Sequence, residues 1–92
     1  MKQIKLRRAV ALILQASKEQ GEVCLTVEQI RDRLMDRNYN NIPSGRKLGQ
    51  ILRSTEGFIV HDRLVFYDKE QRGSVRLTQW TIDWLEVQTW MV

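Results

Sequence analysis

The segment from Asn40 to Arg53, N-N-I-P-S-G-R-K-L-G-Q-I-L-R, concentrates side chains that can bind anions and base edges. Leu48, Ile51 and Leu52 recur at helical spacing and predict an amphipathic helix. Five hydrogen-bond donors lie off this apolar stripe: Arg46, Lys47, Gln50, Arg53 and Ser54. A helix with one buried face and one face of arginine, lysine and glutamine fits a nucleic-acid groove. The same pattern also fits a basic face that is simply solvated.

Three helices are expected to position these side chains. The first covers residues 2 to about 20, where an apolar stripe at helical spacing ends before Gly21. The second begins at Thr26, whose Thr-x-x-Gln capping box includes Gln29, and runs to about Arg37. The third runs from about residue 44 to 56, between the helix-starting pair Pro43-Ser44 and Gly57.

The second part of the chain has the pattern of a β-hairpin. Residues 64–67 and 75–80 are rich in β-branched and aromatic side chains, and a polar loop over residues 68–74 separates them. Residues 58–60 are compatible both with the beginning of the first strand and with a bridge into it. A short strand or single bridge is expected at residues 23–25. Residues 81–92 are compatible with a continued strand, but a short C-terminal helix is favoured.

Length and composition predict one domain over residues 1–92. The formal net charge is +4, and the net positive charge is concentrated in residues 1–20, with +4, and residues 41–60, with +2. No stretch is apolar and long enough to span a bilayer, and Cys24 is the only cysteine, so a cytoplasmic protein is expected. Cys24 and the lone His61 do not form a metal-binding pattern, and no catalytic motif stands out. We therefore expect no cofactor, no metal and no enzymatic activity.

The order of helix, short strand, helix, turn, helix and hairpin resembles a winged helix-turn-helix domain, an α+β fold with a three-helix core and a β-hairpin wing. T-V-E-Q-I-R-D-R-L is similar to second helices of this class, and N-I-P-S-G-R-K-L-G-Q-I-L-R-S is similar to its recognition helices. Gly57-Phe58 resembles the usual exit into the wing. The string G-R-K-L-G-Q-I-L with this Gly-Phe also resembles C-terminal winged-helix modules of phage and archaeal helicases or primases.

The winged-helix resemblance implies roles in binding double-stranded DNA. The third helix would enter the major groove, with Arg46 on guanine and Gln50 on adenine. Lys47 and Arg53 would contact phosphates, and Ser44 with the free N–H groups of the helix start would form a small anion site. The wing would contribute three further contacts, from Lys69, Arg72 and Arg76.

The C-terminal segment predicts a partner. Trp80, Trp84 and Trp90 are more aromatic surface than a core of this size needs, so an interface is expected at Trp84 and Trp90. The simplest interpretation is a homodimeric transcriptional regulator that binds double-stranded DNA. The alternative is a winged-helix module for protein–protein interaction in a replication or transcription complex.

Overall fold

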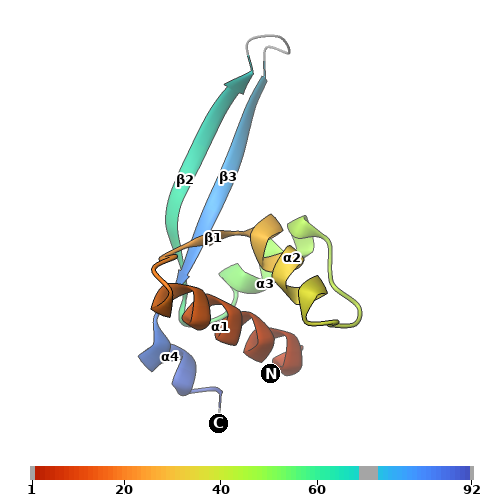
Figure 1. Ribbon diagram of the computed structural model, residues 1–92, viewed down its shortest axis with the longest axis vertical. Coiled ribbons are helices and arrows are strands. Elements are labelled where there is room, and N and C mark those ends of the chain that lie inside the picture. The colour runs from red at the N-terminus through yellow and green to blue at the C-terminus, as the bar shows by residue number, and fades with distance from the viewer. Residues whose placement is uncertain (1, 69–72, 92) are drawn as a thin grey trace.

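The computed structural model describes residues 2–68 and 73–91. Four helices and three strands follow in the order α1 (Ile4–Glu19), β1 (Leu25–Thr26), α2 (Val27–Asp36), α3 (Gly45–Arg53), β2 (Phe58–Asp68), β3 (Gly73–Ile82) and α4 (Trp84–Gln88). Figure 1 shows the helices gathered at one end of the molecule, with the β2–β3 hairpin projecting from them. The chain is therefore an α+β fold with a small antiparallel sheet.

Local sequence signals set the helix boundaries as expected. Gly21, with φ of +94°, follows the end of α1. Thr26 accepts a hydrogen bond from the Gln29 backbone N–H at 3.2 Å, and its own N–H donates to Gln29 Oε1 at 2.9 Å, which completes the predicted capping box. Ser44 Oγ accepts from the Lys47 N–H at 3.3 Å at the start of α3. The predicted starts of the second and third helices are confirmed.

The third helix is shorter than predicted, because it ends at Arg53 rather than near residue 56. Thr55 explains the difference. It is buried, donates its hydroxyl proton to the Ile51 carbonyl at 2.6 Å and accepts a hydrogen bond from the Arg7 guanidinium of α1. These bonds hold the chain in a turn toward α1, and Gly57 then redirects it into β2 with φ of +95°.

The three strands form one antiparallel sheet in the order β1-β3-β2. β1 pairs with β3 through Leu25–Trp80 and Thr26–Gln79, so Thr26 both ends a strand and caps α2. β2 begins at Phe58, which pairs with Ile82 on β3, so residues 58–60 form the beginning of the first hairpin strand, one of the two alternatives that the sequence left open. The register shifts between Val60 and Asp62, which marks a β-bulge at His61. The short strand lies at 25–26 rather than at 23–25.

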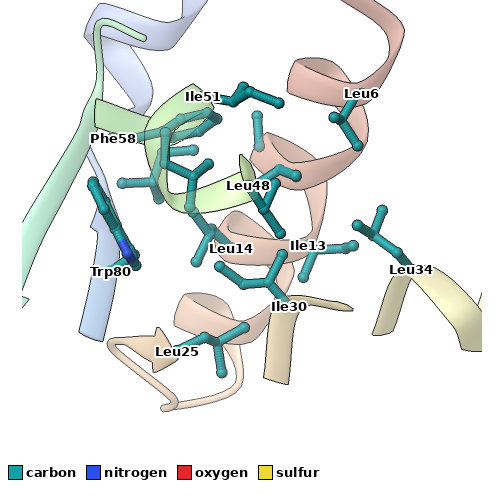
Figure 2. Packing of buried hydrophobic residues seen from close by; sticks show 14 of the residues in the cluster. Leu6, Ile13, Leu14, Leu25, Ile30, Leu34, Leu48, Ile51, Phe58 and Trp80 are labelled. Atoms are coloured by element: carbon teal, nitrogen blue, oxygen red, sulfur yellow. The ribbon is translucent and has the colours of Figure 1, made fainter. Parts of the chain in front are cut away.

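One hydrophobic core joins the helices to the base of the hairpin. Figure 2 shows side chains from α1, α2, α3 and all three strands converging there. Trp80 of β3 is the largest fully buried side chain, and Phe58 and Ile82 close the core at the hairpin base. No helix in residues 2–68 and 73–91 is long and apolar enough to cross a membrane.

The segment after β3 is a short helix, as favoured from the sequence. Asp83 caps α4 by accepting hydrogen bonds from the N–H groups of Leu85 at 3.1 Å and Glu86 at 3.4 Å. The Asp83 N–H donates to the Gly57 carbonyl at 2.8 Å, and Val87 of α4 is buried in the core. The helix thus packs directly against the turn that follows α3.

We expect Gly57→Ala to lower the free energy of unfolding by about 3 kcal/mol. A methyl group at Gly57 would overlap Val87 Cγ2 and lie 3.0 Å from the Val87 backbone nitrogen, at a φ that disfavours side chains. Gly21→Ala is the matched control, since its φ of +94° is equally unfavourable but nothing lies within 4 Å. This control should lose only about 1–2 kcal/mol. Urea unfolding measures both variants, and equal losses would show that α4 does not pack on this turn.

Candidate nucleic-acid interface

The polar face of α3 is fixed by the apolar face behind it. Leu48 and Leu52 are completely buried, and Ile51 is nearly so. Arg46 and Arg53 lie on the opposite side of the helix and are exposed to solvent. The predicted segregation of donors from the apolar stripe is therefore present in the fold, and Gln50 is exposed beside the two arginines.

Lys47 is exposed, but it lies toward a different side of α3. It lines a shallow hollow with the start of α1 and the loop that follows α2, where Lys5, Tyr39 and Asn41 are its neighbours. The sequence placed Lys47 with Arg46 and Gln50 on a single polar face. In the fold, Arg46 and Arg53 instead form a central group with Gln50, and Lys47 lies apart from this group, toward α1.

The central group borders a groove of about 560 Å³ between α3, the start of α2 and β3. Arg46, Gln50 and Arg53 line it from α3 together with two glycines. The remaining lining residues come from the other elements: Thr26, Val27, Glu28, Thr78 and Trp80. Sequence reasoning missed this second wall, because strand β3 is brought beside α3 only by the tertiary fold.

Several basic side chains outside α3 are bonded within the chain. Arg33 forms an ion pair with Glu22 at 2.6 Å, Arg31 donates to the Pro43 carbonyl at 3.0 Å, and Lys18 donates to the Ile82 carbonyl at 3.3 Å. Arg46 and Arg53, by contrast, have no partner among the side chains and backbone groups that the structure describes. Cations without internal partners can bind an external anion without breaking a bond.

Ser44 is the N-cap residue of α3, as predicted. Its hydroxyl oxygen accepts the Lys47 N–H, while the N–H groups of Gly45 and Arg46 belong to the first turn, where a helix offers no internal acceptor. These groups lie at the positive end of the helix dipole. The predicted anion site at this helix start remains a prediction.

Of the three predicted wing residues, Arg76 alone belongs to a strand that the structure describes. Lys69 and Arg72 lie outside the described residues, so the structure does not test them. Arg76 is on β3, where its backbone pairs with Val65 of β2. The hairpin that carries Arg76 projects away from the helices, as Figure 1 shows.

Gly49 lines the groove, although the fold does not require a glycine at this position. It lies in the middle of α3 with an ordinary helical φ, and a Cβ at this position would meet nothing within 4 Å. Gly45, one turn earlier, differs, because its Cβ would lie 2.7 Å from Glu28 Oε1. The G-x-x-x-G spacing of Gly45 and Gly49 is the sequence signal for a side of α3 that carries no side chains at these two positions.

The described residues do not bring metal ligands together. Within residues 2–68 and 73–91 no group of three or more His, Cys, Asp or Glu side chains could hold a metal ion. Cys24 is a free, half-buried thiol, and His61 is exposed at the bulge of β2.

The two C-terminal tryptophans predicted at an interface have different surroundings. Trp90 packs edge-on against Phe58 with ring centroids 6.0 Å apart, and its indole N–H donates to the Glu56 carbonyl at 2.8 Å. Trp84 instead lines an apolar hollow of about 500 Å³ with Leu12, Gln88 and Met91. Trp90 therefore has an internal role, whereas Trp84 faces a hollow that no described part of the chain fills.

Comparisons with protein-family models, curated proteins and solved structures found no match.

We expect Gly49→Ala to raise the free energy of unfolding by about 0.5–1 kcal/mol, because alanine favours the helix and the site is open. Thermal unfolding measures this gain. Gly45→Ala is the comparison, and its gain should be smaller since Glu28 must move aside. A loss of stability in Gly49→Ala would show that the helix wall is more crowded than the structure indicates.

Proposed function

We propose that this protein is a winged helix-turn-helix domain that binds double-stranded DNA, most simply as a small transcriptional regulator. The order α1-β1-α2-α3-β2-β3 and the short sheet at the hairpin base support the fold assignment. The observation that carries the function is the exposed face of α3, where the side chains of Arg46, Gln50 and Arg53 lie together and have no partner among the described residues.

In this proposal the exposed face of α3 enters the major groove. Arg46 near the N-terminus has the planar fork that pairs with guanine O6 and N7, and Gln50 one turn later suits adenine N6 and N7. Arg53 contacts a phosphate. Lys47 and Lys5 line the same hollow at the flank of α3 and contact the phosphates beside the groove. The N–H groups at the Ser44 cap offer a further phosphate site.

The hairpin has the reach of a wing. β2 comprises 11 residues, which at about 3.3 Å per residue span about 35 Å. This length exceeds the distance between adjacent grooves of a duplex, roughly half of a ~34 Å turn. We propose that Lys69, Arg72 and Arg76 on the hairpin contact the backbone or the minor groove next to the site of α3.

We expect Arg46→Ala and Arg53→Ala each to weaken binding to duplex DNA by about tenfold, and the double variant to lose most of the affinity. Removal of a phosphate contact also lowers the slope of log affinity against log salt by about 0.9. Fluorescence anisotropy with labelled duplex at about 50 and 200 mM salt measures both quantities.

Arg37→Ala is the matched control for this experiment. Arg37 follows α2, is exposed, has no side-chain partner among the described residues and lines a hollow on the α1 side of α2, away from the face of α3. Its loss removes the same charge and should leave binding nearly unchanged. Equal losses in all three single variants would indicate attraction to net charge alone, and no binding by the wild type would refute the DNA proposal.

A protein interface is the second candidate function, and the surface between α1 and α4 favours it. Leu12, which is 47% exposed, lines the apolar hollow with Trp84 and Met91, and Leu85, next to Trp84 on α4, is 78% exposed. Exposed apolar surface of this kind usually marks an interface. We propose that a second copy of the chain packs here and forms a homodimer, which would place two α3 helices on a palindromic site. A module in a larger protein complex would use the same surface.

We expect Leu85→Asp to shift the protein from dimer to monomer in sedimentation velocity, because a carboxylate in an apolar contact is costly to desolvate. Met35→Asp is the control, since Met35 is an exposed apolar residue on α2. A wild type that sediments as a monomer at every concentration tested would refute the homodimer.

A further inference from the structure

Trp80 carries a hydrogen-bond donor that the fold leaves without an acceptor. The residue is 1% exposed, and its indole nitrogen, the blue atom in Figure 2, has no hydrogen-bond partner. Trp90 provides the contrast within the same chain, because its indole N–H donates to the Glu56 carbonyl. Buried donors in folded proteins are nearly always satisfied, so an orphaned indole N–H beside a groove points to an acceptor supplied from outside.

The groove that Trp80 lines has the features of an anion site. Arg46 and Arg53 border it as cations that have no side-chain partner in residues 2–68 and 73–91. Thr78, also on its lining, can donate a hydroxyl proton. Glu28 is the one acidic side chain among the described lining residues, and its charge is partly offset by Arg31 at 3.2 Å. The balance of charge along the groove is positive.

Gly49 is independent evidence that a partner molecule can lie close to α3. A glycine in the middle of a helix costs stability, and this glycine is not required by φ or by any neighbour. Its effect is to remove a side chain from the helix wall between Arg46 and Arg53. Glycine at such a position lets the backbone of a partner lie directly against the helix.

We propose that the groove between α3 and β3 binds a phosphate of the DNA backbone, held by Trp80 and Arg53 and brought close by Gly49. This inference rests on the proposed DNA-binding function and assigns one of its contacts. A phosphate fits because it offers only acceptor oxygens and carries a negative charge, whereas base edges also present donors. The indole nitrogen is covered in the free protein, so the bond forms with a small shift of the ring toward the groove.

The indole N–H resonances of ¹⁵N-labelled protein test this contact directly. A short duplex is titrated at about 50 mM salt, and the three indole signals are assigned with Trp80→Phe, Trp84→Phe and Trp90→Phe. The Trp80 proton should move downfield as the new bond forms, while the Trp90 proton, already bonded to Glu56, stays in place. A Trp80 signal that moves no more than that of Trp90, while the backbone amides of α3 shift, would overturn the phosphate site and leave the DNA proposal intact.

Gly49 variants test the close approach without disturbing the core. Gly49→Ala should weaken duplex binding about fivefold, and Gly49→Gln more strongly, even though the melting temperature of Gly49→Ala rises. Opposite changes in stability and affinity separate a binding role from a structural one. Unchanged affinity in both variants would overturn the inference. If the wild type binds no duplex and α3 amides do not shift, the DNA proposal fails and the phosphate site fails with it.

Discussion

The burial of Leu48, Ile51 and Leu52 sets the orientation of α3, and the rest of the molecular surface follows from it. These side chains pack into the core that α1, α2 and β3 share. A rotation of α3 by one residue, 100° about its axis, would expose leucine and bury a guanidinium. The cost of that exchange holds Arg46 and Arg53 outward. Hydrophobic packing on one side of a helix nine residues long thereby determines which chemistry the other side offers.

Short-range features of the fold could be predicted because their causes lie within one turn of the chain. The capping box at Thr26, the Ser44 cap and the glycine after α1 each depend on residues three or fewer positions apart. The short C-terminal helix after Asp83 belongs to the same group. The end of α3 could not be predicted in this way, because the bond between Arg7 and Thr55 joins residues 48 positions apart.

The candidate site was predictable only in part for the same reason. Helical spacing was enough to group Arg46, Gln50 and Arg53, but it could not show that Lys47 lies toward α1. Nor could it show that Trp80 would form part of a groove with α3, since that contact depends on the β1-β3-β2 order of the sheet. Trp84 lines an apolar hollow, whereas Trp90 donates its indole N–H to the Glu56 carbonyl, and this difference depends on contacts between distant parts of the chain.

The bulge at His61 has a consequence for how this architecture can vary. On the side of the bulge toward the helices, Phe58 and Val60 pair with residues of β3 at the core. On the other side, in the projecting part of the hairpin, the two strands pair mainly with each other. In the projecting part of the hairpin, residues that pair across the strands could be inserted or deleted as pairs without changing the strand register next to the helices. The length of the hairpin is therefore free to change in evolution or by design in steps of one residue pair, while the helical body keeps the same sequence requirements.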